Sequence, residues 1–225
     1  MTAPLSLTTR LRLARLAIVV PPERSGPEAA DFAAHGADLL ILTKGGRSVE
    51  ESADGIRAAR NRLFGLQTVV AADDAEVAAA AGADILFLKR PGWRPFGIKR
   101  PHEHALRGRS IDGVDDVGKI DGDPFDFGFV GPAVGGGEAS PEIAAMAAQY
   151  PPTGLPAGPV WFAAGGISSA NVQQVVAAGA RRAAVSTAVF HSEDPFNEAQ
   201  SIAEVLKSAW HADPGAQDYG MAAFG

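Results

Sequence analysis

Residues 159–190 read PVWFAAGGISSANVQQVVAAGARRAAVSTAVF, and this stretch decides the fold. An apolar run ends at the double glycine Gly165-Gly166, a Val- and Ala-rich segment follows, and a further glycine precedes a second apolar run. This order predicts a strand, a glycine turn, a helix that opens at Ser168 or Ser169, and a second strand. Buried strands that alternate with helices are typical of a parallel sheet.

The same succession of helix end, glycine and apolar strand occurs twice more upstream. Residues 33–42 read AAHGADLLIL and residues 79–88 read AAAGADILFL, which parallel AAGARRAAV at residues 177–185. The glycine of each copy suits the left-handed residue that commonly ends a helix. A repeat of this kind indicates successive βα units.

The whole pattern predicts a single (β/α)8 TIM barrel domain over residues 1–225, because about eight buried strands alternate with helices. Strands are expected near residues 16–20, 38–42, 67–71, 84–88, 107–110, 126–130, 159–163 and 182–185. Helices are expected near residues 27–35, 48–63, 74–81, 114–119, 140–149, 169–178 and 197–209. Residues 1–14 are interpreted as an N-terminal extension and residues 210–225 as an irregular C-terminal tail.

One segment breaks the alternation. Residues 89–104 read KRPGWRPFGIKRPHEH, with three prolines and two glycines. Proline removes a backbone donor and disrupts a helix interior, so this composition argues against a regular helix. We expect an irregular segment in place of the fourth helix.

Composition and charge indicate a soluble globular protein with a single domain. A net charge of −6 argues against a nucleic-acid partner, because binding a phosphate backbone needs a concentrated basic face. The absence of cysteine excludes disulfides and thiolate sites and fits a cytoplasmic location. The apolar stretch at residues 16–22 is too short to cross a bilayer, so no membrane partner is expected. Whether the protein forms a homo-oligomer is left open.

The two strand ends within residues 159–190 predict a phosphate site. Gly165 and Gly166 let an anion approach the backbone, and the helix start beside them offers unpaired N–H donors. Val185 and Ser186 end the next strand and would add backbone N–H groups and the Ser186 hydroxyl. This is the phosphate position that loops seven and eight provide in many barrels. The alternative is that the glycines only form a tight turn and a serine only caps the helix.

Other strand ends carry polar residues that would face the same mouth. Asp73 follows the third strand and is a candidate Mg²⁺ ligand, because hard cations take carboxylate oxygens. Equally, Asp73 or Asp74 could serve only as the N-cap of the next helix. The candidates for contact with an anionic ligand are Lys44, Lys89 and Arg90. The alternative for each is that its side chain is only solvated at the surface.

The residues alone do not single out a catalytic group. Asp73, Ser110 and Asp112 are the candidates, since all three follow or end predicted strands. Ser110 could equally serve the structure alone.

The C-terminal third resembles the thiamine phosphate synthase/TenI superfamily, a set of (β/α)8 barrels. The family has AIGGI, an Asn, a helix ending in AGA, and VVSAI before Asp-Pro. Similar sequence stands here as AAGGI at 163–167, Asn171, AGA at 178–180, AVSTAVF at 184–190 and Asp194-Pro195. The family's GPIF is similar to GPAV at 131–134, and its GxS to Gly108-Arg109-Ser110.

The resemblance implies binding of a phosphorylated thiamine-pathway metabolite, either thiazole phosphate or thiamine phosphate. It also implies coupling of thiazole phosphate with hydroxymethylpyrimidine diphosphate. In that reaction Mg²⁺ and basic residues stabilise the leaving pyrophosphate, and the thiazole nitrogen captures the pyrimidine cation.

Several positions depart from the family's pattern. ILTKG at 41–45 replaces a Gln-Leu-Arg-Glu-Lys segment, and Ala72-Asp73 replaces an Asn-Asp pair. KRPGWRP at 89–95 holds no counterpart of the second Mg²⁺-binding Asp. GGGEA at 135–139 replaces a Thr-x-Thr-Lys loop, and Asp112 stands where the TenI branch has a His.

Three hypotheses therefore stay open. The first is a thiamine phosphate synthase-like enzyme, and the second is a non-catalytic or repurposed TenI-like protein that binds a phosphate metabolite. The third is an unrelated phosphate-binding barrel isomerase with Asp112 or Asp73 as its acid/base.

Overall fold

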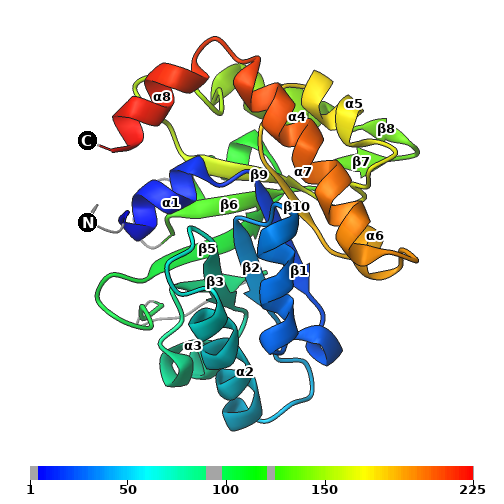
Figure 1. Ribbon diagram of the computed structural model, residues 1–225. Coiled ribbons are helices and arrows are strands. Elements are labelled where there is room, and N and C mark those ends of the chain that lie inside the picture. The colour runs from blue at the N-terminus through cyan, green and yellow to red at the C-terminus, as the bar shows by residue number, and fades with distance from the viewer. Residues whose placement is uncertain (1–4, 90–97, 121–124, 225) are drawn as a thin grey trace.

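The computed structural model describes residues 5–89, 98–120 and 125–224, and their strands close into a parallel barrel. The order around the barrel is β1-β10-β9-β6-β5-β4-β3-β2, which confirms the predicted (β/α)8 architecture (Figure 1). The barrel strands are β1 Leu16–Val20, β2 Leu39–Leu42, β3 Val69–Ala72, β4 Ile85–Leu88, β5 Leu106–Ile111, β6 Phe127–Val130, β9 Val160–Ala164 and β10 Ala183–Val185.

The helices between the strands form the outer layer. The α-helices there are α2 Val49–Arg62, α3 Ala75–Ala81, α4 Pro141–Gln149, α5 Val172–Ala177 and α7 Pro195–His211. In the described part of the chain, the 3₁₀ helices η1 Pro22–Arg24, η2 Pro27–His35 and η3 Val114–Lys119 complete it. The predicted helices at 27–35 and 114–119 are therefore of the tighter 3₁₀ type.

Short elements mark the carboxyl ends of the strands. The hairpin of β7 (Val134–Gly135) and β8 (Glu138–Ala139) follows β6, and the four-residue helix α6 (Thr187–Phe190) follows β10. Both lie on one side of the barrel in Figure 1, and α1 (Leu7–Leu13) and α8 (Ala216–Ala223) lie on the other.

The connection from β4 to β5 is irregular where the structure describes it. Residues 98–105 contain no helix, and residues 90–97 lie outside the described part of the chain. Arg100 holds this connection to the barrel, because its two terminal nitrogens lie 3.1 Å from the two carboxylate oxygens of Asp126. Arg107 adds a second tie by donating to the carbonyl of Ile98 at 2.8 Å.

Two hydrophobic layers hold the barrel, one inside it and one between the strands and helices. Leu39 and Ile41 of β2 point inward and Leu40 outward, because successive side chains of a strand face opposite sides. Four phenylalanine rings pack within the barrel in tilted or edge-to-face pairs, with centroid distances of 4.3–6.1 Å: Phe87, Phe127, Phe129 and Phe162. Gly108 makes room for them, since a Cβ there would lie 2.2 Å from Phe127 Cζ.

The prediction of an irregular tail at residues 210–225 is wrong. Helix α7 extends to His211, and α8 forms a further helix at Ala216–Ala223. Thr9 of α1 donates a hydrogen bond to the carbonyl of Ala223 at 2.9 Å, which joins the two terminal segments. The sequence of the tail shows no periodic spacing of apolar residues, because contacts with residues far away in the chain order it.

Arg182 is the centre of those contacts. Its guanidinium is fully buried and donates to the carbonyls of Pro152 at 3.0 Å and Arg12 at 2.8 Å. It also donates to the Tyr219 hydroxyl at 3.1 Å and lies 5.0 Å from the Trp210 ring centroid. A buried cation requires such partners, so Arg182 fixes α8 against the barrel.

Within the described residues, no helix has the length and apolar character needed to cross a membrane.

Replacing Tyr219 by Phe should lower the free energy of unfolding by about 1.5–3 kcal/mol, the range for a hydrogen bond to a charged group. Urea denaturation measures this. Tyr150→Phe is the matched control, because the Tyr150 hydroxyl bonds the exposed side chain of Gln149. We expect the control to change stability by less than about 0.5 kcal/mol. Equal losses in the two variants would contradict the role of Arg182.

Candidate functional site

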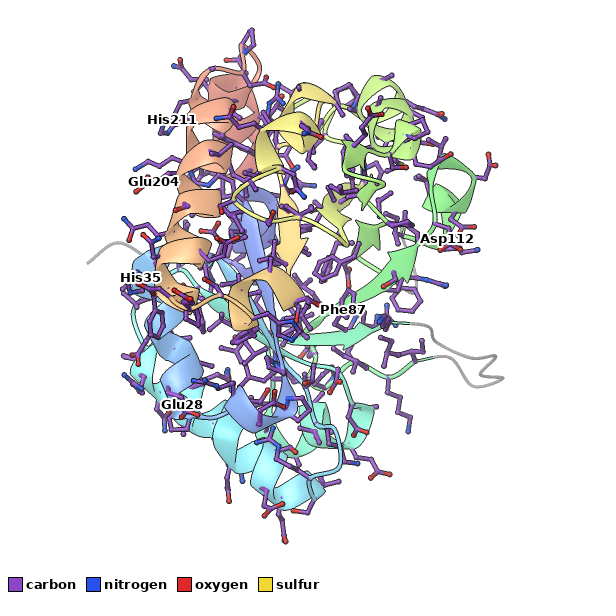
Figure 2. The ribbon with its side chains drawn as sticks, turned by 90° about the vertical axis from the view of Figure 1, so that its right-hand side faces the viewer. Glu28, His35, Phe87, Asp112, Glu204 and His211 are labelled. Atoms are coloured by element: carbon purple, nitrogen blue, oxygen red, sulfur yellow. The ribbon has the colours of Figure 1, made fainter. Side chains whose placement is uncertain are left out.

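A cavity of about 720 Å³ opens at the carboxyl ends of the strands. Figure 2 faces this side of the molecule, with Phe87 near its middle and Asp112 toward its edge. The floor of the cavity is apolar and includes Val19, Ile41, Phe87, Phe129 and Ala184. Most of the predicted site residues line it: Asp73, Lys89, Ser110, Asp112, Gly165, Gly166, Val185 and Ser186.

The double glycine is required by the way that the loop after β6 packs on it. Gly165 has φ 94° and Gly166 has φ 76°, a region that side chains other than glycine rarely adopt. Ala133 N donates to the carbonyl of Ala164 at 2.8 Å, and Val134 N donates to that of Gly165 at 3.1 Å. The predicted tight turn is therefore present, and it also borders the cavity.

Two groups of free backbone donors meet at this cavity. In the described part of the chain, the N–H groups of Gly165, Gly166 and Ile167 donate to no acceptor. The N–H groups of Ser186 and Thr187, which begin α6, are equally free. All five residues line the cavity, so an anion placed between the two loops would meet donors from both sides.

The Ser186 hydroxyl does not serve as the predicted donor. It donates to the carbonyl of Val19 at 2.6 Å and so joins β10 to β1. Toward the cavity its oxygen can only accept, which leaves the backbone N–H of Ser186 as the donor.

The predicted donors at the start of the next helix are also occupied. Regular helix α5 begins at Val172, later than the predicted Ser168 or Ser169. Ser168 N donates to Asn171 Oδ1 at 2.8 Å. Glu198 of α7 accepts from Ser169 N at 2.7 Å and from Ser169 Oγ at 2.6 Å. The chain's own carboxylate therefore satisfies the donors that a ligand would otherwise find there.

Of the adjacent carboxylates Asp73 and Asp74, only Asp74 caps a helix. Asp74 is the N-cap of α3 and accepts from Glu76 N and Val77 N. Asp73 lines the cavity and accepts from Lys44 N at 2.8 Å. Burial raises the pKa of the Asp73 carboxyl above its ordinary value of 3.8. The hydrogen bond from the Lys44 backbone lowers this pKa, but burial has the larger effect.

Lys44, a predicted contact for an anionic ligand, is not among the residues that line the cavity. Its Nζ is 3.5 Å from Asp74 Oδ2, so the side chain pairs with the helix cap. Lys89 does line the cavity, whereas Arg90 lies outside the described residues. Asp112 is exposed at the rim, and its N–H donates to Asp116 at 3.3 Å.

The described donor set fits Mg²⁺ only together with a ligand. No cluster of three or more His, Asp or Glu side chains suited to a metal occurs among the described residues. Mg²⁺ commonly binds one or two carboxylates plus substrate phosphates, and Asp73 offers one carboxylate of this kind.

The sequence reasoning missed Glu198 and the aromatic floor. Glu198 lies 29 residues from Ser169, and no local pattern relates the two. Phe87 and Phe129 occupy strands that are buried on both faces, so an apolar run could not show which side chains point into the barrel.

Comparison with known proteins gives a consistent result, although no family model matches the chain. It is 31% identical to the thiamine-phosphate synthase of Mycolicibacterium smegmatis, over 89% of this chain and 93% of that protein. It is 30% identical to the synthase of Mycolicibacterium gilvum, over 88% and 90%. Among solved structures, thiamine phosphate pyrophosphorylase from Pyrococcus furiosus has a TM-score of 0.73 at 16% identity, covering 91% of this chain and 99% of that one.

Gly166→Ala should disturb the loop contact and the donor cluster together. An added Cβ would lie 2.8 Å from the Val134 carbonyl oxygen. We expect a loss of about 1–2 kcal/mol in unfolding free energy from the left-handed backbone alone. Binding of inorganic phosphate, measured by calorimetry, should weaken at least about tenfold.

Gly135→Ala is the control, because nothing lies within 4 Å of a Cβ at that position. Equal phosphate binding by the two variants would refute the assignment of the donors.

Asp73→Asn tests the raised pKa. The folded protein keeps the Asp73 proton at a pH where the unfolded chain has released it, so stability falls as the pH rises from 3.8 to the raised value. Asn cannot ionise. The stability of the variant relative to the unaltered protein should therefore increase through this window and then become constant. Urea denaturation at successive pH values measures it, and a difference independent of pH would contradict the prediction.

Proposed function

Because this chain belongs to the thiamine-phosphate synthase family, we propose that its barrel mouth binds a phosphorylated thiazole or thiamine phosphate. The phosphate lies between the Gly165–Ile167 turn and the start of α6. The observation that carries this proposal is the convergence of free N–H groups from two loops on one cavity. Hydrogen bonds from several backbone N–H groups bind a phosphate without a cationic side chain.

The rest of the cavity suits a small aromatic ring. Its volume of about 720 Å³ lies in the range of pockets that hold small metabolites. Phe87 and Phe129 have ring centroids 4.3 Å apart, with their planes inclined at 37°, and they provide an apolar aromatic floor beside Ile41. A planar heterocycle can stack on such a floor while its phosphate remains at the rim.

The family relationship also supports coupling with hydroxymethylpyrimidine diphosphate. Mg²⁺ would neutralise charge on the leaving diphosphate, and Asp73, which lines the cavity, would hold the ion. Lys89 is the one cation among the described lining residues, so it would contact the same diphosphate.

A second candidate function is binding without coupling. Lys44 is paired with Asp74, and the described lining carries the carboxylates Asp73 and Asp112 against the single cation Lys89. This charge balance opposes an additional diphosphate unless a metal is bound. The family relationship argues against the third alternative, an unrelated isomerase barrel.

Thiazole phosphate should raise the melting temperature of the protein, because a ligand that binds only the folded state stabilises it by about 2.7 kcal/mol at 100 times its Kd. The unphosphorylated thiazole alcohol is the control and should give a much smaller shift. A thermal-shift titration measures both. Equal shifts, or none with either thiazole phosphate or thiamine phosphate, would overturn the proposed phosphate site.

Formation of thiamine phosphate separates the two candidate functions. The protein is incubated with both substrates and Mg²⁺, and the product is quantified by chromatography. If coupling occurs, Lys89→Ala should reduce kcat/KM by about tenfold or more and leave thiazole phosphate binding nearly unchanged. Thiazole phosphate binding without any product would favour the non-catalytic function.

A further inference from the structure

A second cavity, of about 730 Å³, lies on the side of the barrel where the strands begin. Its walls come from α1, the C-terminal half of α2, the α2–β3 connection and the end of α3. Thr68 and Asp84, which precede β3 and β4, line it, whereas the mouth cavity is lined by residues at the strand ends. The two cavities have no described lining residue in common, so the second is separate from the proposed thiazole phosphate site.

Among the described residues, three arginines line this cavity, and two of them have partners. Arg60 lies 2.9 Å from Asp84 Oδ1. Arg57 lies 2.5 Å from Asp54 and donates to the carbonyl of Ala80 at 2.7 Å. Arg57 and Arg60 thus bond near the C-terminal end of α3, where cations are favourable.

Arg10 differs from both. Its Nε is buried, and its guanidinium makes no hydrogen bond and no ion pair with any described residue. An anion in the cavity would contact the terminal nitrogens of Arg10 and accept charge-assisted hydrogen bonds from them. The guanidinium fork suits a phosphate or carboxylate, which can accept two parallel hydrogen bonds.

The remaining lining is partly apolar and partly polar. Leu63, Leu66 and Val70 form its apolar part, and Phe64 is 92% exposed. The polar part consists of Asn61, Gln67, Thr68 and Asp84. A volume of about 730 Å³ is in the range of pockets that hold organic molecules, which is more than an inorganic ion requires.

We propose that this cavity is a second binding site, for a small organic oxyanion. Arg10 binds the phosphate or carboxylate head, and the apolar body packs on Leu63, Phe64 and Leu66. Because Arg10 belongs to α1 and the apolar residues to the α2–β3 connection, the bound molecule joins these two segments.

Hydrogen–deuterium exchange with phenyl phosphate and with benzoate tests the site. The two probes carry the same ring with different oxyanions, so they distinguish a phosphate site from a carboxylate site. We expect at least one probe to slow exchange in α1 and in residues 60–67, independently of any change at residues 164–168. Arg10→Gln should weaken that probe's binding at least tenfold.

Arg12→Gln is the matched control, because this substitution removes the same charge from the same helix. Arg12 does not line the cavity. The Arg12→Gln variant should bind the probe as the unaltered protein does. Arg10→Lys keeps the positive charge but lacks the guanidinium fork, so it should show an intermediate loss of affinity for the probe. This variant tests the site if Arg10→Gln fails to fold. Protection confined to the mouth, no protection by either probe, or equal losses in Arg10→Gln and Arg12→Gln would overturn the proposal.

Discussion

Closure of the sheet between β1 and β10 is the constraint on which the rest of the molecule depends. Leu16 pairs with Ala183 and Ile18 with Val185, and this register joins the first strand to the last. The Ser186 hydroxyl extends the contact between the two strands by one residue, because it donates a hydrogen bond to the Val19 carbonyl. A closed parallel barrel has no free edge, so each loop has a fixed neighbour at the mouth. The two loops that supply the free N–H groups are adjacent for this reason.

The way that the interior is filled determines where a ligand can lie. The aromatic side chains Phe87, Phe127, Phe129 and Phe162 come from β4, β6 and β9, whereas small residues such as Ala17 and Ala184 come from β1 and β10. Tight packing of the rings is possible only because Gly108 lacks a side chain. Phe87 and Phe129 also form the floor of the cavity. The same residues therefore stabilise the barrel and shape its site.

Charged side chains of the protein itself decide which backbone donors remain for a ligand. Glu198 satisfies the N–H of Ser169, and Asp74 satisfies the first turn of α3. On the opposite side of the barrel, Arg182 draws Tyr219 and Trp210 of the C-terminal segment into the core. Burial lowers the pKa of the Arg182 guanidinium, yet carbonyls and rings surround it in place of a carboxylate. Arg10 is different, since its guanidinium has no such partner among the described residues.

The sequence by itself determined the barrel, because alternation of buried strands, glycine stops and helices is a local pattern that the chain repeats. It also located the Gly165-Gly166 turn and the Val185-Ser186 strand end, since both lie in short motifs. Only the tertiary structure decided which donors stay free, as the Ser186–Val19 bond joins residues 167 positions apart. It likewise ordered the C-terminal tail through Arg182, which is 37 residues from Tyr219. Contacts of such separation leave no period in the sequence, so the fold could be predicted and the final composition of the site could not.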